Sequence, residues 1–225
     1  KYVGVEDLDL DLFESQYPVP DGVTYNSYVI LDEKTAIMDT GDQRGSDQWL
    51  LNVEKALDGR DLDYLVVSHM EPDHGANIAR LAQRYPKAAL VGNAKTFQIL
   101  NQFYSIPQLA ERSVLVKEGD TLSLGSHTLT FAMAPMVHWP EVMAAYESSE
   151  KVLFSADAFG TFGALNGTIF NDEINFDRDW LNDARRYYAN IVGKFGPQVQ
   201  AVIKKLSALD IRIICPLHGP IWRSQ

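Results

Sequence analysis

Short apolar runs alternate with helical patterns along the first half of the chain. The runs at 28–31, 35–38, 64–67 and 88–91 have the length of buried strands. Apolar residues recur at helical spacing in the segments 49–57, 78–82 and 97–103. The first two runs flank the turn Asp32-Glu33-Lys34, which favours a hairpin. Strands that alternate with helices predict an α/β layer fold.

The middle of the chain has a different pattern. Strand candidates at 114–116, 121–124, 129–131, 143–146 and 152–154 are separated by Gly, Asp, Ser and Lys, which is typical of antiparallel strands. We therefore predict a second sheet that contains all of them.

The last part of the chain adds helices and one strand. Helical spacing returns over 180–192, and a further helix is expected after Gly196-Pro197, because proline is accepted in a first helical turn. The run at 211–214 predicts a final strand. No repeat or linker divides the sequence, so residues 1–225 are expected to form one domain with two helix-covered sheets.

The composition describes a protein with a sizeable core and an acidic surface. Of 225 residues, 46% are hydrophobic, which excludes a disordered chain. The 20 Lys and Arg against 30 Asp and Glu give a formal net charge of -10, so nucleic acid and anionic membranes are not expected partners. No apolar run approaches the ~20 residues that a membrane helix requires.

The cysteine content limits the redox setting and the kind of iron site. A single cysteine, Cys215, excludes an internal disulfide and a thiolate-bound iron of rubredoxin type. We expect a reducing, cytoplasmic compartment, and we expect Cys215 to be a small buried hydrophobe.

The strongest chemical signal is the stretch 69–74, which reads His-Met-Glu-Pro-Asp-His. It places four candidate ligands in six residues directly after a predicted buried strand, and Gly75 gives the backbone freedom to turn. A solvated polar loop would explain any one of these residues alone. Four of them in an HxExDH spacing favour a metal site.

Three further candidate ligands also follow apolar runs. His138 comes after 134–137, Asp157 after 152–156, and His218 after the last predicted strand. An α/β layer fold brings strand ends to one edge of the sheet, where ligand sites usually lie. We therefore expect these side chains to converge: His69, Glu71, Asp73, His74, His138, Asp157 and His218.

These segments resemble the metallo-β-lactamase superfamily and, within it, the flavodiiron proteins. The Met-Asp-Thr-Gly at 38–41 is similar to the superfamily's early Asp-Thr-Gly turn, and 69–74 is similar to the diiron variant of its HxHxDH motif. The segments 138–140, 154–160 and 217–220 resemble the remaining flavodiiron signatures. The resemblance covers essentially the whole chain and implies a four-layer αββα sandwich of metallo-β-lactamase type.

The resemblance also implies two non-haem iron ions. The implied ligands are His69, Glu71 and His138 for one iron, Asp73, His74 and His218 for the other, and Asp157 as the bridge. Two imidazoles and one terminal carboxylate on each iron suit a ferrous ion with open positions for a gas. A hydrolytic dizinc relative would carry histidine in place of Glu71, whereas a carboxylate there favours the ferric state and hence redox chemistry.

The activity implied by the resemblance is reduction of dioxygen to water, or of nitric oxide to nitrous oxide. Two ferrous ions store only two electrons, so turnover needs a flavin or rubredoxin-type donor. In flavodiiron proteins FMN is carried by a following flavodoxin-like domain and acts across a head-to-tail homodimer. The sequence has no flavodoxin-type phosphate loop and does not begin with methionine, so we expect an excised diiron domain without its own FMN.

Two other functions stay open from the sequence. A stand-alone diiron protein could bind dioxygen tightly and report it to a signalling partner. A dizinc hydrolase of glyoxalase or lactamase type would use a metal-bridged hydroxide as nucleophile, but Glu71 argues against it.

Other residues receive structural roles. Asp39 is expected to orient the ligand loop through hydrogen bonds, and His127 to lie away from the metals. Five aromatic residues are candidates either for an apolar lining over the metals or for the core: Tyr25, Tyr28, Trp139, Phe159 and Phe162.

Overall fold

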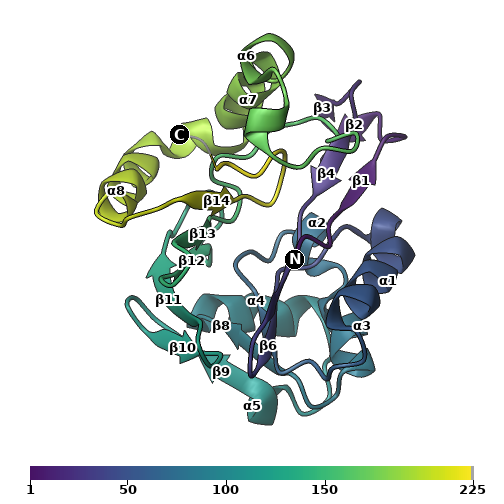
Figure 1. Cartoon of the computed structure of the whole chain (residues 1–225), viewed down its shortest axis with the longest axis vertical. Coiled ribbons are helices and arrows are strands. Elements are labelled where there is room, and N and C mark those ends of the chain that lie inside the picture. Colours follow the sequence, from purple (N-terminus) through teal and green to yellow (C-terminus); the bar gives the residue numbers. More distant parts are fainter. Residues whose placement is uncertain (224–225) are drawn as a thin grey trace.

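Two sheets packed face to face form the centre of the computed structural model, which describes residues 1–223 (Figure 1). The first has the order β5 (Tyr28–Leu31), β6 (Thr35–Met38), β7 (Tyr64–Val66), β8 (Ala89–Gly92) and β9 (Ser113–Leu115). The second has the order β10 (Thr121–Ser123), β11 (Thr128–Met133), β12 (Met143–Glu147), β13 (Val152–Phe154) and β14 (Ile213–Cys215).

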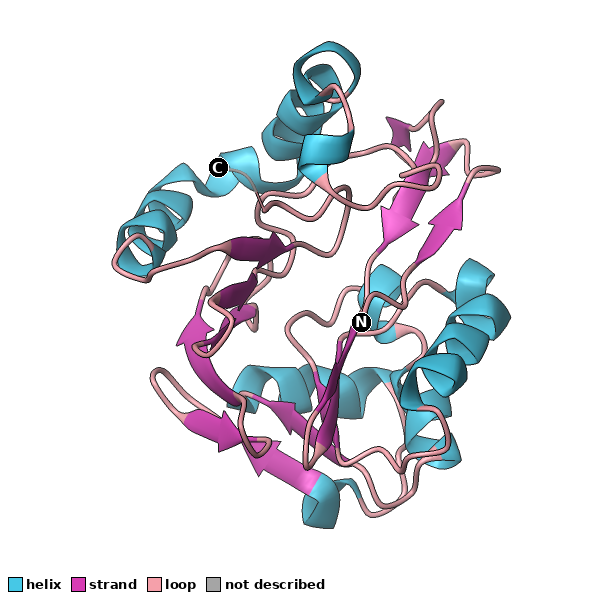
Figure 2. Ribbon diagram, viewed as in Figure 1, coloured by secondary structure: helices cyan, strands magenta, loops and turns pink. Residues whose placement is uncertain are grey.

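Helices cover the outer face of each sheet (Figure 2). The first sheet carries α1 (Ser46–Leu57), α3 (Ile78–Arg84), α4 (Ala94–Phe103) and the short α5 (Leu109–Arg112). The second carries α8 (Gly196–Leu206), with α6 (Phe176–Asp179) and α7 (Leu181–Tyr187) beside it. Single turns complete the set: η1 (Gln43–Gly45), α2 (Pro72–Gly75), η2 (Asn171–Glu173), η3 (Tyr188–Val192) and η4 (Gly193–Phe195). The predicted four-layer αββα sandwich is confirmed.

Alternation along the strands produces the layers. In β6, Ile37 packs in the cluster that contains Trp49 of α1, while its neighbour Met38 lies in the cluster between the sheets. In β13, Leu153 packs with Leu206 of α8. Because successive side chains of a strand point to opposite faces, each sheet is apolar on both sides and needs both a facing sheet and a helical cover.

One predicted pairing is wrong. The sequence pattern grouped 114–116 with the antiparallel strands, but β9 joins the first sheet and runs parallel to β8, with Val91 opposite Val114. The helices α4 and α5 form the crossover that a parallel pair requires. The strands β10 to β13 are antiparallel as expected, and β14 then pairs parallel to β13.

Four very short strands near the N-terminus were not predicted. They form two two-stranded sheets, from β1 (Val5–Asp7) with β4 (Val23–Tyr25) and from β2 (Leu12–Phe13) with β3 (Tyr17–Pro18). Strands of two or three residues are too short for a periodic apolar pattern to develop. In residues 1–223, no helix combines the length and apolar character that crossing a membrane requires.

Candidate metal centre

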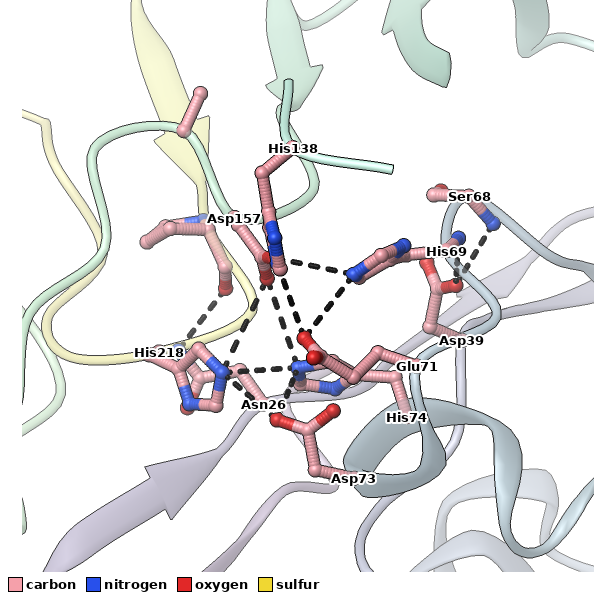
Figure 3. Close-up of polar contacts among 12 residues, drawn as sticks. Asn26, Asp39, Ser68, His69, Glu71, Asp73, His74, His138, Asp157 and His218 are labelled. Atoms are coloured by element: carbon pink, nitrogen blue, oxygen red, sulfur yellow. Dashed lines mark hydrogen bonds and ion pairs between the residues drawn. The ribbon is translucent and has the colours of Figure 1, made fainter. Parts of the chain in front are cut away.

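Segments that follow strands of both sheets bring the predicted ligands together (Figure 3). His69 follows β7, and Asp73 and His74 lie on α2. Asp157 follows β13, and His218 follows β14. Together with Glu71 and His138 they form two groups: His69, Glu71, His138 and Asp157, and then Asp73, His74 and His218. The expected convergence of all these side chains is therefore seen.

The first group is built around Glu71 and Asp157. His138 Nε2 lies 3.0 Å from Glu71 Oε2 and 3.1 Å from Asp157 Oδ2. His69 Nε2 lies 3.3 Å from each of the same two oxygens. Two imidazole nitrogens and two carboxylate oxygens therefore point at one small volume.

The second group is equally tight. His74 Nε2 and His218 Nε2 are 3.0 Å apart, and they lie 3.2 Å and 3.1 Å from Asp73 Oδ2. The other oxygen of Asp157, Oδ1, is 3.7 Å from His74 Nε2 and 3.9 Å from His218 Nε2. Asp157 thus faces one group with each oxygen, as a bridging carboxylate would.

Several polar atoms of this centre lack hydrogen-bond partners among the described residues and are suited to bind cations. Both oxygens of Asp73 and both of Asp157 are buried and make no hydrogen bond within residues 1–223. His218 Nδ1 lies 2.6 Å from the carbonyl oxygen of Thr24, which only accepts. The His218 Nδ1 must therefore carry the proton, and this leaves the Nε2 lone pair directed into the centre. Buried oxygen and nitrogen atoms whose lone pairs have no hydrogen-bond partner are the atoms that a metal ion binds.

The electrostatics also favour positive charge here. Burial alone lowers the pKa of imidazole, yet Asp73 and Asp157 raise the pKa of His74 to about 9. Burial raises the pKa of the Asp157 carboxyl, but His69 and His138 outweigh it and hold that pKa well below its usual range. The carboxylates thus hold charge and attract cations, so metal ions would displace protons from the imidazoles.

Residues outside the two groups hold the ligands in place. Asp39 Oδ1 accepts hydrogen bonds from the backbone N–H of Ser68 (2.7 Å) and of His69 (3.2 Å), which confirms its predicted supporting role. Asn26 donates from its side chain to the carbonyls of Pro216 (3.0 Å) and Gly219 (2.8 Å), on either side of His218. Strand ends alone would leave these loops free to move.

Glu141 is a functional residue that the sequence reasoning missed. Its side chain is fully buried, and its Oε1 lies 2.8 Å from His69 Nδ1. The same oxygen accepts the backbone N–H of Met70 at 2.8 Å. A possible signal was the position of Glu141 directly after His138-Trp139-Pro140, since a carboxylate near a metal-binding histidine often orients a ligand.

Aromatic rings enclose the centre. Trp139 packs on His69 with ring centroids 5.4 Å apart, and Tyr25 lies 5.8 Å from His218. Tyr187, which the sequence did not single out, lies 5.5 Å from His218, and Phe162 packs on Tyr187. These rings form an apolar surround that limits the access of water.

Two of the aromatic candidates do not line the centre. Phe159 is 46% exposed. Tyr28 lies between the sheets against Phe154 and donates its hydroxyl to the carbonyl of Pro216. The location of these two rings is set by contacts between residues far apart in the sequence. Their closeness in sequence to the motifs therefore did not predict it.

His127 and Cys215 are in their predicted places. The backbone N–H of His127 donates to Asp32 Oδ2 at 2.6 Å, and His127 is in neither candidate metal group of residues 1–223. Cys215 is buried between the sheets, with its thiol free.

Comparisons with known proteins agree with this arrangement. The sequence profile described as ODP family beta lactamase matches residues 23–219. The anaerobic nitric oxide reductase flavorubredoxin of Aliivibrio salmonicida is 34% identical over 228 residues, a match that covers 100% of this chain and 45% of that protein. An uncharacterized protein of Methanocaldococcus jannaschii is 36% identical over 222 residues, covering 99% of this chain and 55% of its own length.

Solved structures give the same picture. The flavodiiron protein from Giardia intestinalis superposes with a TM-score of 0.93 at 28% identity, over 100% of this chain and 54% of that one. The rubredoxin oxygen:oxidoreductase from Desulfovibrio gigas gives a TM-score of 0.90 at 32% identity, over 99% of this chain and 55% of that one. The chain thus spans about half the length of the proteins it matches.

Proposed function

This chain belongs to the ODP beta-lactamase family, and from that premise we propose that it is a diiron oxidoreductase domain. Its reaction is the reduction of dioxygen to water, of nitric oxide to nitrous oxide, or of both. The names of its relatives, which include a nitric oxide reductase and an oxygen:oxidoreductase, support both substrates.

The proposed ligands follow the two groups of the centre. They are His69, Glu71 and His138 for the first iron, Asp73, His74 and His218 for the second, and Asp157 between them. Bound iron would supply ferrous electrons and open coordination positions for a diatomic gas. The protein orients the imidazoles through Glu141 and the Thr24 carbonyl, and the Trp139 ring shields His69 from water.

The observation that carries this proposal is the position of the Glu71 carboxylate among the ligands of the first group. Its Oε2 lies 3.0 Å from His138 Nε2 and 3.3 Å from His69 Nε2, so this oxygen faces the same metal position as the two imidazoles. Burial raises its pKa, but His138 and His69 lower the pKa to about 2, and Glu71 is therefore an anion at neutral pH. An anionic oxygen ligand stabilises the ferric state in a way that a third imidazole would not.

We also propose a flavin or rubredoxin-type electron donor and a head-to-tail homodimer. The relatives named flavorubredoxin and rubredoxin oxygen:oxidoreductase support the kind of donor. We place FMN outside these 225 residues, because the sequence has no flavodoxin-type phosphate loop. Light scattering of the purified protein at several concentrations tests the dimer, and a monomer at all of them would contradict it.

The decisive experiment combines metal analysis with gas kinetics. The protein is expressed anaerobically in iron-rich medium, its iron and zinc are quantified, and the reduced form is mixed with dioxygen or nitric oxide by stopped flow. We expect two irons per chain and repeated gas consumption when a reduced flavoprotein is supplied. Glu71→His should shift the metal preference towards zinc and slow the reaction with dioxygen.

Two outcomes would overturn the proposal. Two zinc ions with esterase or thioesterase activity, and no iron, would identify a hydrolase. Reduced diiron protein that holds dioxygen for a long time and does not turn over with the flavin donor would identify a dioxygen sensor. Unchanged iron loading and rate in Glu71→His would show that this carboxylate does not select the chemistry.

A further inference from the structure

The two metal positions have the same kinds of ligand. Each group offers two imidazole Nε2 atoms and one terminal carboxylate, and each faces one oxygen of Asp157. The ligands alone therefore predict two irons with similar affinity and similar reduction potential. Any difference must come from the groups that contact the ligands from behind.

Those supporting groups differ in charge. His69 Nδ1 lies 2.8 Å from the Glu141 carboxylate, whereas His218 Nδ1 donates to a neutral carbonyl, that of Thr24, at 2.6 Å. His74 Nδ1 has no hydrogen-bond partner in the described part of the chain. The first position therefore has a carboxylate hydrogen-bonded to one of its imidazoles. Within residues 1–223, no carboxylate is hydrogen-bonded to Nδ1 of either histidine of the second position, and the buried Asp39 acts on His74 only through space.

Glu141 is placed to act strongly on His69. It is fully buried, so solvent does not screen its charge. Its Oε1 accepts from both His69 and the backbone N–H of Met70, while Oε2 has no hydrogen-bond partner within residues 1–223. A carboxylate that accepts the Nδ1 proton makes an imidazole a stronger donor at Nε2.

We propose that Glu141 makes the two irons unequal. The His69 position binds its metal more tightly and favours the ferric state, and the Asp73–His74–His218 position accepts the first electron. This inference rests on the proposed diiron function and assigns Glu141 as a positioning residue, because it acts through His69 and not on the metal itself.

Glu141→Gln tests this, because glutamine keeps one oxygen for both hydrogen bonds and removes the charge. Its amide nitrogen replaces Oε2, which has no partner within residues 1–223, so the fold of the variant is checked first by circular dichroism. The matched control is Glu147→Gln, which removes a buried carboxylate at the far end of β12, roughly 20 Å further along the strand. Stepwise reduction of the iron-loaded protein with dithionite, followed by electron paramagnetic resonance, gives the potentials. Metal competition gives the affinities.

In Glu141→Gln we expect iron affinity at the first position to fall 10- to 100-fold. The ferric preference should also weaken. A tenfold loss in the ratio of ferric to ferrous affinity raises the potential of this one-electron couple by about 59 mV. Glu147→Gln should leave both quantities unchanged. Wild-type potentials and affinities in Glu141→Gln would overturn the inference.

A second measurement needs no variant and covers a Glu141→Gln protein that does not fold. Wild-type protein is crystallised with less than one equivalent of cobalt(II), and anomalous scattering shows which position fills first. The inference requires the His69 position, and preferential filling of the other position would refute it. If two irons bind but prove equivalent, only this inference fails, whereas binding of zinc alone would reject the diiron function itself.

Discussion

In the proposed diiron centre, Asp157 is the residue that links the two metal positions. Its Oδ2 lies 3.1 Å from His138 Nε2 in the first group, and its Oδ1 lies 3.7 Å from His74 Nε2 in the second. A terminal ligand would serve one group only. Removing this side chain should therefore affect both metal positions together.

Asp157→Ala should lose at least one metal ion per chain and nearly all activity, because a shared ligand is removed. Metal content by mass spectrometry of the purified protein checks this. His127→Ala is the control, since His127 lies near Asp32 and away from the centre. Equal metal loss in both variants would contradict the bridging assignment.

Cys215 should be chemically inert in the folded protein. Burial raises the pKa of its thiol to about 12, so almost none of it is thiolate at pH 8. Iodoacetamide at pH 8 should not modify the native protein and should modify it fully in guanidinium chloride. Because the chain has one cysteine, intact mass spectrometry gives an unambiguous reading. Native alkylation at the rate of a free thiol would show that β14 opens readily.

The sequence revealed ligands more readily than their supports. The 69–74 stretch places four candidate ligands within six residues, a local spacing that can be recognised without a structure. Glu141 contacts His69 across 72 positions of sequence, and Asn26 contacts Pro216 across 190. Contacts of such range follow from the packing of the two sheets, and no local pattern announces them.

The loop after β14 is held in shape by contacts with other elements. Asn26 holds the carbonyls on both sides of His218, and the Oγ1 of Thr24 accepts the backbone N–H of Gly219 at 2.6 Å. Gly219 itself has a φ of +75°, and a Cβ there would meet Thr161 Cγ2 at 2.3 Å. β4 and the linker that follows it thus shape the loop that presents His218.

Asn26→Ala should destabilise the protein by about 1–3 kcal/mol, because two buried carbonyls lose their donor. It should also weaken metal binding at the Asp73–His74–His218 position more than at the other. Urea unfolding and metal titration check the two effects. Asn101→Ala, which removes an exposed amide from α4, should change neither. A similar loss of both metals would mean that Asn26 supports the fold in general.

The strands themselves were predictable where their apolar runs are long enough. The runs at 28–31 and 35–38 coincide with β5 and β6, because four buried or half-buried residues give a clear signal. The sheet to which a strand belongs was harder to predict from the sequence. β9 has half-buried and exposed residues only, so its sequence resembles the antiparallel strands that follow it, and its parallel partner is set by α4 and α5.

For the whole molecule, metal binding and folding should be coupled. The centre gathers buried carboxylates that repel one another as anions when no cation lies between them. Its residues come together only when both sheets are in place. A ligand that binds only the native state stabilises it by mass action. Metal removal should therefore lower the melting temperature.

At free iron about 100 times the dissociation constant, one site contributes about 2.7 kcal/mol. For a domain of this size that corresponds to a shift of roughly 5–10 °C. Calorimetry of chelator-treated and iron-reconstituted protein under anaerobic conditions measures it. Asp157→Ala should show a much smaller shift on adding iron. Identical melting temperatures with and without iron would show that the native state does not bind the metal in preference to the unfolded chain, and would contradict this coupling.

The parallel pairing of β13 with β14 has a consequence for the assembly of the protein during translation. Phe154 lies opposite Cys215, yet α6, α7 and α8 are synthesised between them. On the ribosome, the 69–74 loop emerges long before β14 and the loop after it, which carries His218. A nascent or truncated chain that lacks β14 therefore has no complete second position and should not retain a pair of ions. If the proposed centre binds iron, the pair of ions can therefore assemble only in chains whose translation has passed His218, although the first group is complete earlier.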